Sequence, residues 1–229
     1  MKFYRLTIDS GNGFQVVVDQ PPRELLQKEL YAPYTFDTID SLLLDLDKKK
    51  KKTDVLLVGT LGLLGFPAHD RVCEILKDFH LRDVQFVKIT GGGLDDYQFV
   101  FFNSDLTSKL DYHKTHLAFI KDFLGDIEEL DIEVPKNRNG AIKIYRKHAF
   151  DSTFNKMIPK NGYHFLLGFD INEYDGFRIG HFDKSFYVSE NVKNALEAAQ
   201  ITNIVFSEST LFNNPEPVVA PIKKTWKFW

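Results

Sequence analysis

An amphipathic helix enclosed by two β-type runs is the feature that most constrains the fold of this chain. Between residues 69 and 79, apolar side chains recur at the three- and four-residue spacing of one helix face: Val72, Ile75, Leu76 and Phe79. An apolar run, Val55 to Val58, precedes this segment, and another, Val84 to Ile89, follows it. The pattern predicts a strand–helix–strand unit over residues 54–90.

A second copy of this pattern occurs further along the chain. A short strand at Phe186–Val188 is followed by Ser189, a good N-cap residue, by a helical stripe from Val192 to Ala199, and by a closing strand at Ile201–Phe206. An ungapped shift of 120 positions lays residues 72–86 on residues 192–206 and matches all seven apolar positions, although only three of the 15 pairs are identical. We therefore expect a second unit at residues 183–209. A duplication would explain the match. Any two strand–helix–strand units would also match in part, because their apolar residues follow the same helical and strand periods.

The remaining segments mostly favour strands. Residues 3–8 and 14–18 alternate around a Gly- and Asn-rich loop, which predicts a hairpin, and residues 115–124 have helical spacing. Further strands are expected at 98–102, 141–145 and 164–169. The sequence thus predicts a mixed α/β (α+β) fold, with residues 1–212 forming a single domain of two strand–helix–strand units and extra antiparallel strands. Residues 213–229 form a tail that contains proline and tryptophan.

Composition excludes several classes of protein. With 229 residues, of which 43% are hydrophobic, the chain can bury a sizeable core. No apolar run approaches the roughly 20 residues that cross a bilayer, and the first residues do not resemble a signal peptide. The single cysteine, Cys73, excludes an internal disulfide, and a net charge of −3 argues against nucleic-acid binding. We expect a cytoplasmic protein without a membrane or nucleic-acid partner; oligomeric state is not indicated.

Candidate catalytic and metal-binding residues are few. His113 and His116 lie three positions apart beside Asp111, a spacing that can place ligands on one helix face, but no further ligand is evident nearby. The glycines at 91–93 match no phosphate-binding motif and are expected to form a turn. Cys73 falls beside the helical core stripe, where a packing role is expected. We expect no metal, no cofactor and no catalytic site. The alternative is an enzyme or ligand-binding protein that uses Asp111, His113 and His116.

An acidic run is the main candidate for binding a partner. Between residues 122 and 133 the chain has six acidic residues and no basic one: Asp122, Asp126, Glu128, Glu129, Asp131 and Glu133. Such a run can be a solvated face, or it can steer and hold a basic protein.

Two lysine-rich segments are also notable. Lys48 to Lys52 are five consecutive lysines, which repel one another and predict a solvated loop. In the tail, lysines surround Trp226 and Trp229, which can anchor an interface or fold back over the core. An adaptor that docks through this tail is therefore a further alternative.

Residues 185–206 contain S-F-Y-V-S-E at 185–190, N-A-L-E-A-A at 194–199 and a strand pattern at 201–206. These pieces resemble the C-terminal signature of bacterial immunity proteins of the eleventh polymorphic-toxin immunity family, in which a glycine usually stands near the position of Asn203. Residues 3–6, 53–57 and 111–115 are similar too. The resemblance implies a protein without catalytic activity that binds a cognate toxin and occludes its active site. Candidate contacts for that toxin are the acidic run together with Trp226 and Trp229.

Overall fold

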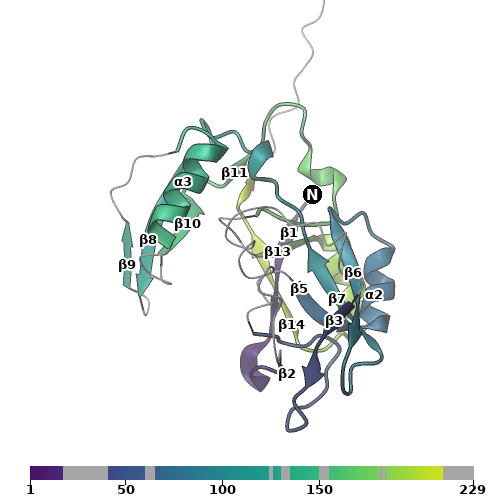
Figure 1. Ribbon diagram of the computed structural model, residues 1–229. Coiled ribbons are helices and arrows are strands. Elements are labelled where there is room, and N and C mark those ends of the chain that lie inside the picture. The colour runs from purple at the N-terminus through teal and green to yellow at the C-terminus, as the bar shows by residue number, and fades with distance from the viewer. Residues whose placement is uncertain are drawn as a thin grey trace, which may run out of the picture.

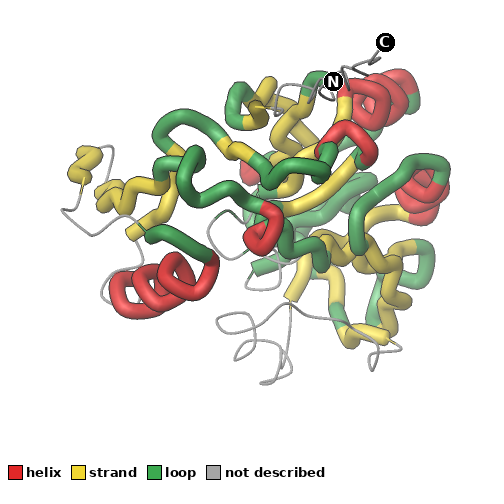
Figure 2. The backbone as a smooth tube through the Cα atoms, turned by 90° about the horizontal axis from the view of Figure 1, so that it is seen from above, coloured by secondary structure: helices red, strands yellow, loops and turns green. Residues whose placement is uncertain are grey.

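The computed structural model describes residues 1–17, 41–59, 65–123, 126–129, 135–149, 155–180, 183 and 185–213 (Figures 1 and 2). They form the mixed α+β fold that the sequence predicts. The helices in this part of the chain are η1 (Ser10–Asn12), α2 (Asp70–Lys77), η3 (Thr107–Lys109), α3 (Arg138–Ala149), η4 (Ile171–Glu173) and α4 (Glu190–Ala198). The strands are β1 (Phe3–Ile8), β2 (Val16–Val17), β3 (Ser41–Leu43), β4 (Asp45–Leu46), β5 (Gly65–His69), β6 (Val84–Thr90), β7 (Tyr97–Phe102), β8 (Leu117–Phe123), β9 (Asp126–Glu129), β10 (Asn155–Pro159), β11 (Tyr163–His164), β12 (Gly176–Arg178), β13 (Phe186–Ser189), β14 (Ile204–Ser209) and β15 (Phe212–Asn213). Leu25, Leu26 and Leu30 have the spacing of a short helix in the sequence, but residues 24–30 lie outside the described residues.

The first predicted unit forms, but with a different leading strand. Strands β5 and β6 both pair antiparallel with β7, so they run parallel to each other with β7 between them, and α2 connects them. The prediction of a strand at Val55–Val58 is wrong, because Val55 and Val58 make only isolated bridges, to Ala68 and Val16. Burial explains why this segment is apolar, and a segment can be buried without pairing along its length with another strand. We did not expect β5, since Gly65 and Pro67 are residues that usually weaken a strand.

The second unit has the same arrangement. Strands β13 and β14 both pair antiparallel with β1, so they are parallel to each other with β1 between them, and α4 connects them. The middle strand here is the first strand of the chain, whereas in the first unit it follows the helix. The predicted hairpin at residues 3–18 is therefore wrong: β1 pairs within this sheet, and β2 pairs with β4. Turn residues such as Gly11 and Gly13 indicate a reversal but do not fix the partner strand.

The two units correspond in local detail at the 120-residue shift. The last residue of each leading strand caps its helix: His69 Nδ1 accepts a hydrogen bond from the Arg71 N–H, and Ser189 Oγ accepts one from the Val192 N–H. The predicted N-cap at Ser189 is confirmed. The residue that precedes each closing strand has a positive φ, 48° at Asp83 and 70° at Asn203. Asparagine and aspartate are enriched in this conformation.

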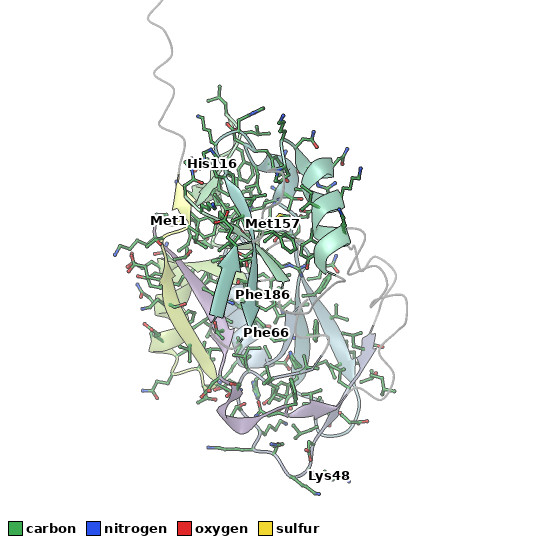
Figure 3. The ribbon with its side chains drawn as sticks, turned by 90° about the vertical axis from the view of Figure 1, so that its left-hand side faces the viewer. Met1, Lys48, Phe66, His116, Met157 and Phe186 are labelled. Atoms are coloured by element: carbon green, nitrogen blue, oxygen red, sulfur yellow. The ribbon has the colours of Figure 1, made fainter. Side chains whose placement is uncertain are left out.

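Both units contribute to a common core. Helices α2 and α4 contact each other, and Val72, Leu76, Val192 and Leu196 are buried in the same cluster. Within this cluster, the rings of Phe66 and Phe102 of the first unit lie 5.6 Å and 4.8 Å from the ring of Phe186 of the second. Figure 3 shows Phe66 and Phe186 close together in the middle of the molecule.

The sheet of the first unit is covered on both faces. Along β7, Val100 and Phe102 belong to the common core, whereas Phe99 and Phe101 face a second cluster with residues of β3 and β6. Leu42 and Ile89 are part of that second cluster, and the strand order is β3-β6-β7-β5. The lysines at 48–52 lie in a loop, as predicted, and Lys48 lies at the opposite end of the molecule from His116 (Figure 3).

Three predictions for the middle of the chain need correction. The segment predicted to be a helix at 115–124 is strand β8, and the strand predicted at 141–145 lies inside helix α3. Short apolar segments fit both periods, and here the local signal is Asn137, whose side chain caps α3 by accepting a hydrogen bond from the Gly140 N–H. The predicted strand at 164–169 is also too long, because β11 ends at His164.

Candidate partner-binding surface

Strands β8, β9 and β10 and helix α3 form a side lobe, set to one side of the two units (Figures 1 and 2). The sheet order is β10-β8-β9, and both pairings are antiparallel. Helix α3 contacts β10. The outermost described strand of the lobe is therefore β9, which carries part of the acidic run.

One face of the side lobe joins the third hydrophobic cluster of the protein. Leu117 and Phe119 alternate along β8, and Met157 lies opposite Phe119 on β10. These three side chains are buried with Ala141 of α3. The same cluster includes Phe177 of β12, so the side lobe and the second unit share buried apolar surface.

A polar joint fixes the start of α3. Arg138 donates a hydrogen bond to the Asp105 carboxylate at 2.7 Å and another to the Thr107 hydroxyl at 2.9 Å. The Tyr112 hydroxyl donates to the backbone carbonyl of Thr107 at 2.9 Å, and burial raises the pKa of Tyr112. Asp105 is largely buried, so its ion pair with Arg138 holds α3 against the η3 turn more firmly than a surface pair could.

The structure gathers part of the acidic run on one hairpin. Asp122 lies in β8, whereas Asp126, Glu128 and Glu129 lie in β9. In the register of the hairpin, Asp122 is opposite Ile127 and Phe123 is opposite Asp126. The remaining predicted contacts, Asp131, Glu133, Trp226 and Trp229, lie outside the described residues.

Two lysines near the acidic strand were missed by the sequence analysis. Lys160, which follows β10, forms an ion pair with Glu129 at 2.5 Å between Nζ and Oε1, and both side chains are about half exposed. Lys121 of β8 lies directly opposite Glu128 in the register. The acidic run contains no basic residue between positions 122 and 133, but in the folded structure Lys121 and Lys160 lie next to it. The ion pair with Lys160 reduces the negative charge at Glu129.

In the part of the chain that the structure describes, the histidine candidates do not form a metal site. Asp111 turns the chain by accepting hydrogen bonds from the N–H groups of His113 and Lys114, and both His113 and His116 are exposed. The segment is a turn that leads into β8, so the helix face that their spacing requires does not exist. Within the described ranges, no group of three potential ligands could hold a metal ion.

The glycine run and Cys73 have structural roles. Gly91–Gly93 form a turn after β6, where a side chain at Gly91 would collide with the Leu44 carbonyl. The Gly92 N–H donates to the Asp45 carboxylate at 2.6 Å, a negative group that opposes phosphate binding at this turn. Cys73 is buried in α2, and burial raises the pKa of its thiol to about 12.

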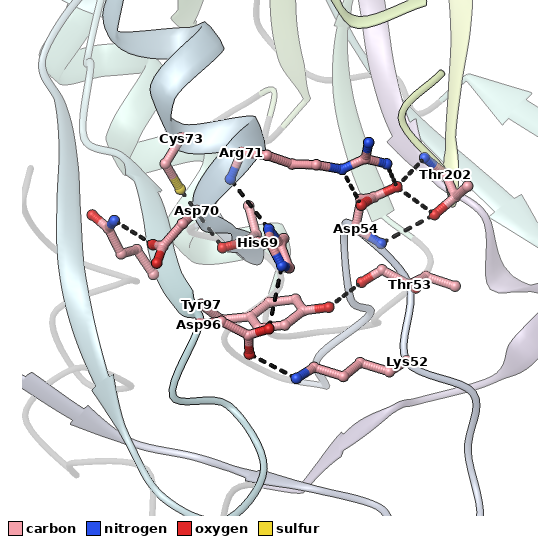
Figure 4. Close-up of polar contacts among 12 residues, drawn as sticks. Lys52, Thr53, Asp54, His69, Asp70, Arg71, Cys73, Asp96, Tyr97 and Thr202 are labelled. Atoms are coloured by element: carbon pink, nitrogen blue, oxygen red, sulfur yellow. Dashed lines mark hydrogen bonds and ion pairs between the residues drawn. The ribbon is translucent and has the colours of Figure 1, made fainter. Parts of the chain in front are cut away.

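A polar network surrounds the N-terminus of α2 (Figure 4). Asp54 binds the Arg71 guanidinium through both carboxylate oxygens and also accepts hydrogen bonds from Thr202. Burial acts to raise the pKa of Asp54, but the hydrogen bonds from Arg71 and Thr202 outweigh it and lower that pKa to about 2.

The other half of the network centres on Asp96. Its carboxylate bonds Lys52 Nζ at 2.6 Å and His69 Nε2 at 3.2 Å, beside a hydrogen bond of 2.6 Å from the Tyr97 hydroxyl to the Thr53 carbonyl. Both aspartates thus bind groups of the protein itself. The network joins the start of α2 to the turn before β14, and it acts as a structural joint.

No protein-family model matches this chain, and no curated protein matches it either. Among the described residues, no helix is both long and apolar enough to cross a membrane.

Proposed function

We propose that this protein binds a basic bacterial toxin and neutralises it, with the side lobe as the capture surface. The observation that carries the proposal is that part of the acidic run, Asp126 to Glu129, forms the outermost described strand of a sheet set apart from the main body. Opposite charge on a projecting edge speeds the encounter with a basic partner.

The proposal names a toxin as the partner because residues 185–206 resemble the immunity-protein family. These residues form β13, α4 and the start of β14, and Val188, Val192 and Leu196 among them are fully buried or nearly so. Such positions define an architecture and do not contact a partner. The surface that recognises the toxin is therefore expected elsewhere on the molecule, which is consistent with the side lobe.

The acidic edge alone is too small for tight binding. Stable protein interfaces bury about 1,600 Å² in total and depend on a few buried anchors. We therefore assign the edge to steering and alignment of the toxin, with further contacts around it.

Co-expression tests this proposal. The product of the reading frame adjacent to this gene is expressed with and without the protein, and both growth and co-purification are scored. We expect growth to be rescued and the two proteins to purify together.

A matched pair of variants tests the role of the edge. The β9-neutral variant carries Asp126→Asn, Glu128→Gln and Glu129→Gln, whereas the control-neutral variant carries Glu74→Gln, Asp78→Asn and Asp95→Asn at exposed positions of the first unit. Both change net charge equally. Rescue weakened only in the β9-neutral variant supports the proposal, and equal rescue by both removes the edge from it.

A further inference from the structure

Strand β9 presents backbone groups as well as charge. It pairs with β8 on one side, and among the described strands nothing pairs with its other side. In an antiparallel ladder, alternate residues direct their N–H and C=O groups toward the paired strand, so the residues between them direct these groups outward. About half of the backbone groups of β9 therefore face away from β8.

We propose that an extended basic segment of the partner adds to the outer edge of β9 and becomes the fourth strand of the side-lobe sheet. This inference rests on the proposed function and specifies how the partner is held. Strand addition uses the main chain for affinity and the alternating side chains for specificity.

The register of the hairpin specifies the incoming strand. Positions 126 and 128 of β9 fall on one face of the sheet, and positions 127 and 129 fall on the other, on the side of Ile120 and Ile158. Ile158 is 38% exposed. Opposite charges and apolar pairs stabilise neighbouring strands. The segment that fits therefore carries basic residues on both faces, because positions 126 and 128 are acidic on one face and position 129 is acidic on the other, and it places an apolar residue beside position 127.

The same charges oppose pairing between two copies of this chain. Bringing β9 against another β9 would place Asp126, Glu128 and Glu129 close to their own copies, and like charges on neighbouring strands are destabilising. Charged edge strands are a common protection against such self-association. The occupant is therefore a basic segment of another protein and not a second copy.

Two synthetic peptides are the probes for this inference. One is an extended decapeptide of alternating lysine and valine, and the other replaces each valine by proline, which keeps the charge but removes every second backbone N–H donor. Binding is measured by titration, and protection of β9 amides by hydrogen exchange. We expect the lysine–valine peptide to bind about tenfold more tightly, because the proline peptide loses several main-chain hydrogen bonds, and to slow exchange at alternate residues of β9.

Proline substitutions within β9 provide a second readout. Ile127→Pro and Glu128→Pro each remove one backbone N–H from β9. Because neighbouring residues of a strand direct their N–H groups to opposite sides, one variant loses an N–H that faces outward and the other loses an N–H that bonds β8. We expect one variant to keep its folding stability and lose peptide binding, and the other to lose stability. The Glu128→Gln variant controls for the lost charge.

The outcomes separate the mode of binding from the proposed function. Equal binding of both peptides without protection of β9 overturns strand addition but leaves capture by charge in place. No binding of either peptide, with growth rescue retained, also overturns strand addition. Protection of β9 in the free protein as its concentration rises would indicate self-pairing and would overturn the assigned occupant.

Discussion

The Asp54 carboxylate accepts a hydrogen bond of 2.8 Å from the backbone N–H of Thr202, 148 residues further along the chain. Thr202 lies in the turn between α4 and β14 of the second unit, whereas the Asp54 carbonyl binds the N–H of His69 at the end of β5 in the first. Asp54 thus connects the beginning of one unit to the turn of the other.

A reciprocal relationship holds for Asp175. Its carbonyl accepts a hydrogen bond from the Ser189 N–H at the end of β13, and its carboxylate accepts one of 3.2 Å from the His80 N–H, in the turn between α2 and β6. Each unit therefore supplies an aspartate that holds the helix–strand turn of the other. These hydrogen bonds connect the two units, and they lead to predictions that do not depend on any partner.

Replacement of Asp54 by asparagine is expected to destabilise the protein in a pH-dependent way. The pKa of Asp54 is lowered in the folded state to about 2 from the ordinary value of 3.8, so its contribution is fully present above about pH 4 and is lost as pH falls through about 2. A shift of this size corresponds to about 2 kcal/mol. Urea unfolding at neutral pH and near pH 2 measures the free energy of unfolding of wild type and variant. The difference between these two free energies should become smaller in acid.

An exposed aspartate provides the control for that experiment. Asp78→Asn at the end of α2 changes the same kind of group at an exposed position. If the difference in unfolding free energy between wild type and Asp54→Asn stays constant down to about pH 2, the ion pair of Asp54 does not contribute to stability.

The two helix caps are expected to differ in their contribution. His69→Ala removes a cap at a partly exposed helix start, which typically costs about 1 kcal/mol, together with a solvent-exposed contact to Asp96 that adds little. Ser189→Ala removes a cap and also the hydrogen bond of 2.7 Å that the fully buried Ser189 hydroxyl donates to Asp175, so its cost should be about twice as large. Chemical denaturation of the two variants measures both costs. Equal losses would mean that the Ser189–Asp175 bond adds no stability.

The turn before β6 gives a conformational prediction. Asp83 has a φ of 48°, in the left-handed region that β-branched residues avoid. We expect Asp83→Val to destabilise the protein by about 1–3 kcal/mol, and Asp83→Gly to be nearly neutral. Thermal unfolding of both variants measures the difference, and similar melting temperatures would contradict the assigned strain.

Cys73 gives a prediction about access to the core. Burial raises the pKa of its thiol to about 12, so the reactive thiolate is scarce in the folded protein near neutral pH. A disulfide reagent should modify Cys73 in urea, where the chain is unfolded, and leave it largely unmodified in native buffer. Rapid labelling of one thiol per native chain would show that α2 opens readily.

The sequence predicts those features that depend on local periods. The stripe at Val72 and Leu76 and the cap at Ser189 are each determined by a few neighbouring residues, and the structure confirms both helices. The helix at 138–149 was missed because the alternation of Ile142 and Ile144 around Lys143 resembles a strand, although Asn137 offered a cap signal.

Features that depend on distant pairing could not be predicted in this way. The partners of β1 are 180 or more residues away along the chain, and no local signal distinguishes them from the nearer β2. Lys160 reaches Glu129 only because β10 and β9 flank β8 in one sheet. The acidic run could therefore be identified from the sequence, but its strand pairing and the lysines beside it required the structure.

The central claim is that the acidic edge of the side lobe captures a basic partner. The most direct measurement is the association rate of the adjacent gene product with wild type, the β9-neutral variant and the control-neutral variant, at low salt and at physiological salt. The account predicts an association about tenfold slower for the β9-neutral variant alone at low salt, with the difference shrinking as salt screens the charges. Equal rates for the two neutralised variants at low salt would contradict it.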